Sequence, residues 1–142
     1  MNIHYVTTPK GISAEQLQGF FVDWRHSPST ATHLRILQNS DEIVLALDED
    51  TGQVVGYITA ITDHVISAYI PLLEVLPAYQ GQGIGTELVQ RMLEQLSDFY
   101  MVDLLCDARL QPFYARFGMT PVPGMALRRY ARLQEIEAKR KT

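Results

Sequence analysis

The alternation of apolar and polar positions along this 142-residue chain predicts a single α/β domain. Short apolar runs typical of buried strands are separated by segments whose apolar residues recur every three or four positions, as on one face of a helix. Strands are expected at 3–6, 42–47, 53–62, 65–76, 101–106 and within 125–129. Helices are expected at 14–22, from position 29 or 30 to 39, from the end of the glycine-rich stretch at 81–85 to 96, and at 111–117. This order predicts a mixed, twisted sheet of about six or seven strands flanked by about four helices.

The stretch from Leu72 to Leu96 is the most informative part of the pattern. An apolar strand that contains Glu74 is stopped by Pro77, which has no N–H for the sheet ladder. A glycine-rich turn follows and leads into an amphipathic helix, whose apolar face consists of Leu88, Val89, Met92, Leu93 and Leu96. Because the first turn of a helix has free N–H groups and a positive dipole end, this stretch predicts an anion-binding site.

Two families of nucleotide-binding proteins use a similar turn, and the spacing argues against both. A P-loop ends in Gly-Lys-Ser/Thr, whereas this turn ends in Gly85-Thr86-Glu87. A dinucleotide fingerprint beginning at Gly81 needs Gly or Ala at position 86, and an acidic residue at the end of the next strand. Asp103 has roughly the right separation but lies at the start of its strand.

Two motifs in the right order resemble those of the GNAT superfamily of N-acetyltransferases. The first is Val75-x-Pro77 followed by Gln80-Gly81-Gln82-Gly83-Ile84-Gly85, and the second is the run from Pro112 to Met119, PFYARFGM. The resemblance implies a GNAT-type α/β fold in which the strands before and after the central helix splay apart and acetyl-CoA enters the gap. It also implies a set of cofactor-binding residues: Val75, Leu76, Gln80, Gly81, Gln82, Gly83, Ile84, Gly85 and Thr86.

The resemblance further implies direct transfer of an acetyl group from acetyl-CoA to a primary amine, without a covalent enzyme intermediate. Backbone N–H groups of residues 82–86 would bind the pyrophosphate, and a strand N–H near Val75 or Leu76 would stabilise the developing oxyanion. Tyr114 matches the family tyrosine that protonates the leaving thiolate. The same fold could also serve as a non-catalytic acyl-CoA-binding module, and this second interpretation stays open.

The general base is less determined by the sequence. Glu74 is a carboxylate in an apolar strand, where burial would raise its pKa, but it could instead pair with Arg91 or Arg109. Asp107, after the following strand, is a second candidate for the base, and a chain of water molecules is a third. The acceptor also stays open between a small-molecule amine and a peptide amine, although the loops around Trp24 and around Asp63-His64 are expected to select it.

Composition narrows the cellular context and the partners. The net charge is −4, and residues 128–142 hold six basic and two acidic residues, so the preceding body is strongly acidic and is not expected to bind nucleic acid. A single cysteine, Cys106, and the lack of a long apolar run favour a cytoplasmic protein with no membrane segment. The four histidines have no ligand spacing, so no metal is expected.

The sequence also predicts a division between a domain and a tail. Residues 1–130 are expected to form the domain, and residues 131–142 a basic tail in the form of a frayed helix, with Glu135/Lys139 and Glu137/Lys141 pairs. Pro71 lies inside a predicted strand and indicates a bulge near the cofactor gap. A homodimer is an open possibility, since many relatives are dimers.

Overall fold

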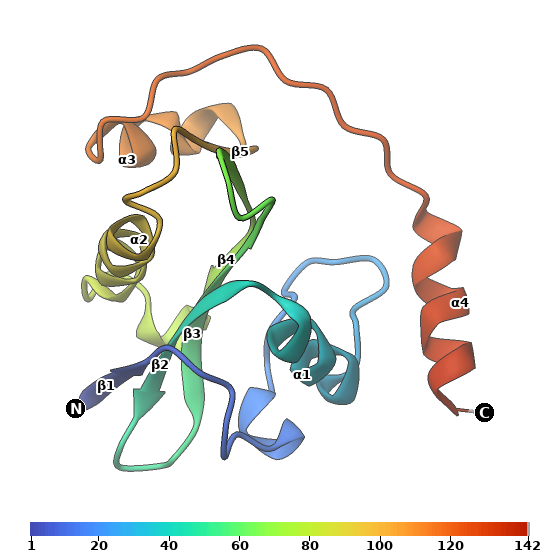
Figure 1. The fold of residues 1–142 in the computed structure, drawn as a ribbon. Coiled ribbons are helices and arrows are strands. Elements are labelled where there is room, and N and C mark those ends of the chain that lie inside the picture. Colours follow the sequence, from blue (N-terminus) through green and yellow to red (C-terminus); the bar gives the residue numbers. More distant parts are fainter. Residues whose placement is uncertain (142) are drawn as a thin grey trace.

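A computed structural model describes residues 1–141, with side chains to residue 138, and confirms the α/β class (Figure 1). The strands are β1 Ile3–Val6, β2 Glu42–Asp48, β3 Val54–Thr62, β4 Ser67–Val75 and β5 Met101–Leu104. The α-helices are α1 Thr30–Asn39, α2 Ile84–Gln95, α3 Gln111–Ala115 and α4 Tyr130–Lys141. Short 3₁₀ turns lie at Ala14–Leu17, Pro77–Tyr79 and Ala108–Leu110.

The five strands form one mixed sheet in the order β1-β2-β3-β4-β5. The pairs from β1 to β4 are antiparallel, whereas β4 and β5 are parallel. Since parallel neighbours need a crossover, α2 makes this connection across one face of the sheet. The prediction of a mixed sheet is therefore confirmed, with five strands in the described chain rather than six or seven.

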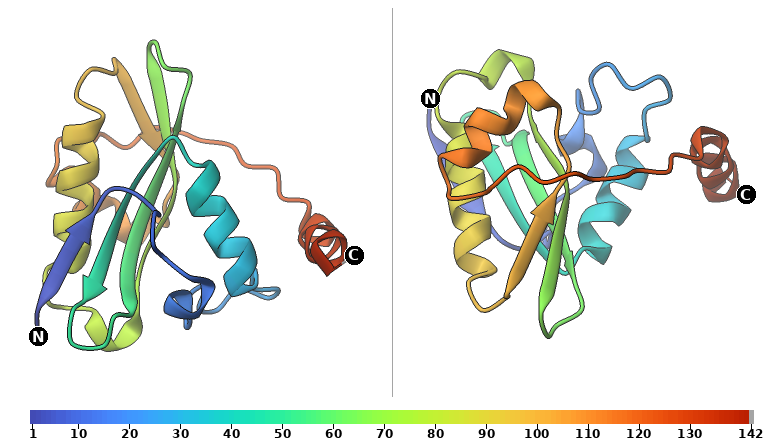
Figure 2. Two further views of the ribbon diagram at one scale, coloured as in Figure 1. Left: turned by 60° about the horizontal axis from the view of Figure 1, so that its bottom comes forward. Right: turned by 90° about the horizontal axis from the view of Figure 1, so that it is seen from above.

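Helices cover both faces of the sheet (Figure 2). Successive side chains of β3 point to opposite faces, as in any strand. Gly56 lies under α2, where a Cβ atom would come within 3.1 Å of Leu88 and 3.2 Å of Ile84, so the glycine allows helix and sheet to approach closely. Tyr57 points to the other face, where its buried ring lies 5.0 Å from Phe20 and 4.4 Å from His33 of α1. The core thus has two halves, one on each side of the sheet.

β4 and β5 separate along their length. β5 pairs only with Ser67–Ile70, so the second half of β4 continues without a partner on that side. Pro71 lies where the splay begins, in the predicted bulge: Thr59 is opposite Leu72 and Ile61 is opposite Tyr69, which leaves one extra residue on β4. The proline has no N–H to donate and is tolerated at this irregular position.

Two predicted elements are wrong, each for a physical reason. The helix expected at 14–22 is a single 3₁₀ turn, because Gly19, Phe21 and Asp23 adopt left-handed backbone angles (φ 95°, 62° and 68°) that end a right-handed helix. The strand expected within 125–129 is irregular. A strand needs a neighbouring edge to pair with, and residues 119–129, which we call the arm, lead away from the body towards α4 (Figure 2).

The C-terminal helix begins at Tyr130 and extends to Lys141. Its described side chains include an Arg132–Glu135 pair at 2.9 Å, while the predicted pairs with Lys139 and Lys141 lie outside the described side chains. No helix within residues 1–141 is long and apolar enough to span a bilayer.

Candidate active site

The glycine turn opens the N-terminus of α2 to an incoming anion. Gly81 and Gly83 have positive φ angles of 77° and 86°, and a Cβ at either position would meet no atom within 4 Å. Gly83 is the N-cap of α2, and no side chain of the described chain caps this helix. The first-turn N–H groups are therefore exposed beside open space, which fits a pyrophosphate.

Arg116 adds a positive charge at the same helix end. Its Nη2 donates a hydrogen bond to Thr86 Oγ1 at 3.2 Å, and its guanidinium stacks 5.4 Å from the ring centre of Phe113. Sequence reasoning missed this residue, although it lies inside the PFYARFGM motif. The basic position in that motif was the available signal, but only the fold brings it to α2.

The splayed edge of β4 presents the backbone N–H of Val75 to the gap. Leu76 N donates to Val55 O of β3 at 2.8 Å, so the N–H of Leu76 is already used. Val75 is opposite Gly56 and its N–H points the other way, towards the side that β5 has left. Gln80 Nε2 donates to Val75 O at 3.0 Å and thereby fixes the strand end next to the glycine turn. Of the two expected oxyanion donors, the geometry favours Val75.

Tyr114 comes from α3, across the gap from β4. It is half-buried, its ring lies 5.0 Å from that of Phe113, and with Cys106 it lines a cavity of about 290 Å³ between the end of β5 and the start of the arm. Burial, aided by the negative charge that Cys106 can carry, raises the pKa of Tyr114 to about 12. The phenol is therefore fully protonated at neutral pH and available as a donor.

Glu74 faces the α1 side of the sheet. Its carboxylate accepts hydrogen bonds from Phe21 N at 2.8 Å and Val22 N at 3.2 Å, and from the hydroxyl of Tyr57. Burial and this contact raise the pKa of Tyr57 far above its usual range. Glu74 thus ties β4 to the loop that precedes α1, and holds Phe21 in its left-handed conformation.

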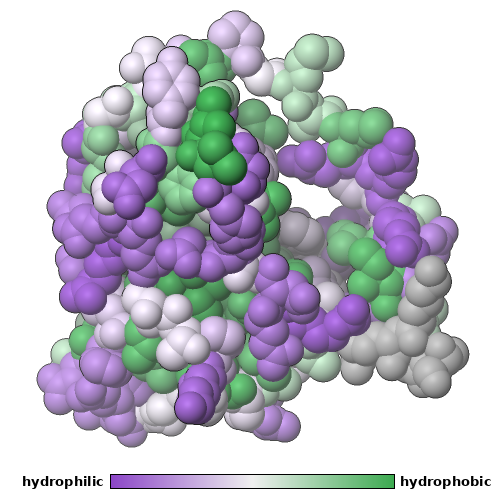
Figure 3. All heavy atoms as spheres, in the orientation of Figure 1, coloured by the Kyte–Doolittle hydropathy of each residue, from purple (hydrophilic) through white to green (hydrophobic). Residues whose placement is uncertain are grey.

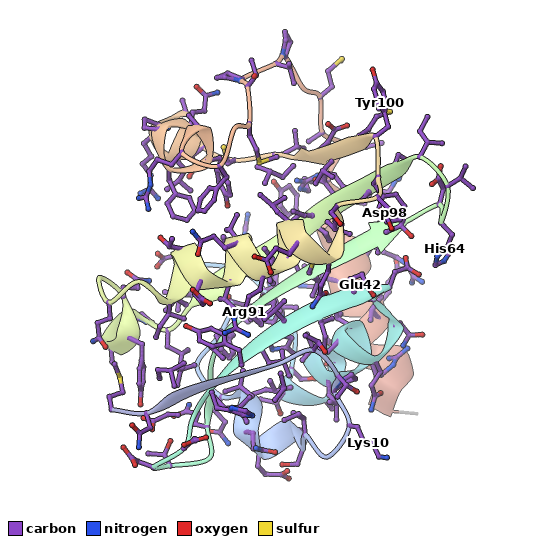
Figure 4. All side chains as sticks on the ribbon, turned by 60° about the vertical axis from the view of Figure 1, so that its left-hand side comes forward. Lys10, Glu42, His64, Arg91, Asp98 and Tyr100 are labelled. Atoms are coloured by element: carbon purple, nitrogen blue, oxygen red, sulfur yellow. The ribbon has the colours of Figure 1, made fainter. Side chains whose placement is uncertain are left out.

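The remaining charged candidates have partners elsewhere. Arg91 pairs with Glu87 at 2.8 Å, and its guanidinium lies 4.5 Å from the ring centre of Tyr5 of β1. In Figure 4, Arg91 projects from α2. Arg109 pairs with Asp107 at 3.7 Å. Neither arginine pairs with Glu74, so that expectation is wrong. Asp107 is largely exposed to solvent.

The loop held by Glu74 borders a large cavity. Trp24 packs 5.0 Å from Phe21, and the cavity of about 550 Å³ lies between residues 23–26 and the segment from Arg128 to Leu133. Ser29 N donates to Glu137 Oε1 at 3.2 Å, and His26 shares a hydrogen bond with Gln134, so α4 forms the far wall. Figure 3 shows this hollow between the body and the C-terminal segment.

The histidines are spread over the fold. His4 lies beside Glu49, His64 beside Asp41, His26 beside Gln134, and His33 is in the core. Within the part of the chain that the structure describes, no group of three or more His, Cys, Asp or Glu side chains could hold a metal ion.

Comparison with known proteins agrees with this geometry. Residues 10–119 match the model of the acetyltransferase (GNAT) family, which is more than half of the chain. The solved structure of a candidate acetyltransferase from Deinococcus radiodurans R1 superposes with a TM-score of 0.88 and 44% identity, over 91% of this chain and 90% of that one. A GNAT-family acetyltransferase from Streptococcus pneumoniae TIGR4 superposes with a TM-score of 0.72 and 28% identity, over 91% and 99%. The chain belongs to the GNAT family of acetyltransferases.

Curated relatives match over shorter stretches. GCN5-related N-acetyltransferase 3 of Arabidopsis thaliana, named as chloroplastic, is 34% identical over 57% of this chain and 38% of its own length. Histone acetyltransferase TAP1 of Glycine max is 32% identical over 50% of this chain and 32% of its own length. The chain therefore matches only about a third of the length of these relatives, 38% and 32%.

Proposed function

We propose that this protein transfers the acetyl group of acetyl-CoA directly to a primary amine. The observation that carries the proposal is the uncapped glycine turn of α2, which lies beside the gap that β5 leaves along β4. An anion site next to an open sheet edge suits a ligand with a pyrophosphate at one end and an extended arm at the other. The names of the Arabidopsis relatives as N-acetyltransferases support the amine as acceptor.

The first step is to hold the cofactor. The N–H groups of residues 82–86 would bind its pyrophosphate, and Arg116 of the segment after α3 would supply positive charge; the uncapped start of α2 and the Arg116–Thr86 hydrogen bond support this assignment. Gln80 keeps the end of β4 in position through its bond to Val75 O. When bound, acetyl-CoA supplies the activated acetyl thioester.

The chain then stabilises the charge that develops during transfer. With acetyl-CoA bound, the N–H of Val75 would donate to the thioester carbonyl oxygen, where negative charge would develop as the amine displaces the thiolate. Tyr114 would donate to the sulfur of the leaving thiolate. Because its pKa of about 12 exceeds that of a free thiol, near 8.5, a strong hydrogen bond with late proton transfer fits better than early release of the proton.

The amine proton leaves through water. Glu74 already accepts from two backbone N–H groups and one phenol, so we assign it the role of holding the acceptor loop, with a chain of water molecules as base. Asp107 is exposed and paired with Arg109, and is a weaker candidate for the base. Trp24, on the loop that Glu74 holds, lines the cavity that we propose for the acceptor, whether a small molecule or a peptide.

Calorimetric titration with acetyl-CoA, with ATP and NAD as controls, tests the proposal. We expect binding of acetyl-CoA alone, with a dissociation constant of about 10 μM or below. Acetyl transfer is then measured with a panel of amine acceptors by the release of free thiol. Tight binding without transfer to any amine would favour the non-catalytic acyl-CoA-binding module, and no binding by folded protein would overturn both interpretations.

A further inference from the structure

The cavity beside the loop of residues 23–26 is basic, although the protein as a whole is acidic. Arg25 lines the cavity from the loop, and Arg128 and Arg129 line it from the segment that leads into α4. Among the described residues of its walls, Asp23 is the one with a carboxylate. The chain has a net charge of −4, so an excess of positive charge in this one place favours an anionic ligand there.

The arginines of this cavity have no carboxylate partner within the part of the chain that the structure describes. By contrast, Arg91, Arg109 and Arg132 each pair with a nearby carboxylate. A guanidinium is charged at any pH near neutrality, and its planar fork of N–H donors matches the oxygens of a carboxylate or a phosphate. Three unpaired guanidinium groups on the walls of one cavity therefore suit a ligand that carries such a group.

Exposed aromatic side chains lie in the same cavity. Trp24 is 45% exposed and Tyr130 is 66% exposed, and both line it together with Leu133 of α4. Its volume of about 550 Å³ is in the range of sites that hold small organic ligands. Rings in a concave site offer apolar contact to the body of a ligand. The size and the lining together suit a small molecule that has both an apolar part and an anionic group.

Two contacts connect this cavity to the proposed reaction centre. The rings of Trp24 and Phe21 lie 5.0 Å apart, and Phe21 N donates to Glu74 at 2.8 Å. Glu74 precedes Val75, whose N–H faces the gap between β4 and β5. An acceptor in the cavity would therefore rest against the loop that β4 holds. With its anionic group at the arginines, its amine would point past Trp24 towards the gap.

We propose that the acceptor is a small primary amine that carries a carboxylate or a phosphate, and that Arg25, Arg128 and Arg129 select it. This inference rests on the proposed function, because it assigns the substrate class of the same site. The amine nitrogen forms an amide bond to the acetyl carbon in place of the C–S bond, and one proton passes overall from the nitrogen to the thiolate sulfur. The anionic group takes no part in bond making; it is the group by which the arginines orient the amine.

Matched pairs of acceptors test the substrate class. L-phenylalanine is compared with phenylethylamine, and phosphoethanolamine with ethanolamine, because the members of each pair differ only in the anionic group. The release of free thiol measures transfer. In the wild type, kcat/KM is expected to be about tenfold or more higher for the anionic member of at least one pair. The two pairs distinguish a carboxylate from a phosphate as the preferred group.

A double variant, Arg128→Gln with Arg129→Gln, tests the role of the cavity. We expect the ratio of kcat/KM between the anionic and the neutral amine to fall by about tenfold, mainly through a higher KM for the anionic one. The ratio cancels differences in reactivity between the amines. Arg35→Gln is the matched control, because Arg35 is exposed on α1, outside the cavity, and has no ion pair in the described structure. This control should leave the ratio within about twofold.

The outcomes separate this inference from the proposed function. Transfer to the neutral amines that equals or exceeds transfer to their anionic partners would overturn the inference and leave the acetyltransferase activity standing. Equal falls of the ratio in the double variant and in Arg35→Gln would also overturn it, since net charge alone would then explain the preference. A preference for a peptide amine over both anionic amines would contradict the small-molecule class. No transfer to any amine would overturn the proposed function, and this inference with it.

Discussion

At the scale of single residues, Tyr114 is the sharpest test of chemistry. Tyr114→Phe keeps the ring that packs on Phe113 and removes only the hydroxyl. We expect kcat to fall by about 100-fold, the usual size of a general-acid contribution, while the dissociation constant for acetyl-CoA stays within about twofold. Tyr100→Phe is the control, since Tyr100 is 85% exposed at the opposite end of β5. An unchanged kcat would remove Tyr114 from the mechanism.

Arg116 tests binding rather than chemistry. Its guanidinium is held at the start of α2 by the bond to Thr86 and by stacking on Phe113, where a bound phosphate would meet it. We expect Arg116→Ala to weaken acetyl-CoA binding by about tenfold in calorimetry, with little change in kcat at saturation. Arg109→Ala removes an equal charge from an exposed position that pairs with Asp107 and should leave the affinity unchanged. Equal losses in the two variants would mean that only net charge matters.

At the scale of elements, the glycine turn combines backbone geometry with ligand access. Gly83→Ala forces a side chain into the left-handed region, which costs about 1 kcal/mol, and places a methyl group where the phosphate would lie. Gly11→Ala is a matched control, because Gly11 has a φ of 80° and equally open surroundings far from α2. We expect similar losses in melting temperature and a loss of acetyl-CoA affinity only for Gly83→Ala. Unimpaired binding by that variant would exclude phosphate contact at position 83.

The link between β4 and the loop before α1 depends on Glu74. Glu74→Gln keeps one carbonyl oxygen but cannot satisfy both loop amides and Tyr57 together. We expect a higher KM for the amine and a lower melting temperature, while kcat falls by less than about tenfold and its pH profile keeps its shape. A fall of about 100-fold or more, with loss of one limb of the profile, would instead make Glu74 the general base.

Elements with a strong periodic pattern were predictable, and those set by distant contacts were not. The start of α1 is an example: the sequence left it open between positions 29 and 30, and in the structure Ser29 is the cap, with its Oγ accepting from Thr32 N at 3.1 Å. The helix after Ser13 failed because Phe21 and Asp23 adopt left-handed angles that no local signal marks, and Glu74, remote in sequence, holds the first of them. The glycine turn of the site was visible in the sequence. Arg116 and the choice of Val75 over Leu76 depend on tertiary hydrogen bonds.

At the scale of the whole molecule, the core half between the sheet and α1 contains an unusual group. His33 is 1% exposed, lies within 4.4–5.3 Å of the rings of Tyr57, Phe21 and Phe20, and neither ring nitrogen has a partner in the described structure. Burial lowers its pKa to about 4, because the imidazolium would lose its hydration among aromatic rings. The folded protein therefore holds this histidine neutral.

The acid stability of the molecule should follow from this group. Above about pH 6.5 His33 is neutral in both states and has no effect. As the pH falls from there to about 4, the unfolded chain takes up a proton that the folded one resists, and folding loses about 3 kcal/mol. The pKa of Asp63 is lowered to about 2 by hydrogen bonds from three loop amides, so its protonation lowers the stability of the fold only below about pH 4. The effects of His33 and Asp63 on stability therefore fall in separate pH ranges. Urea unfolding of the wild type and of His33→Leu between about pH 7 and pH 4 measures the difference. The free energy of unfolding should fall more steeply in the wild type, and parallel slopes would show that His33 becomes protonated in the folded state without penalty.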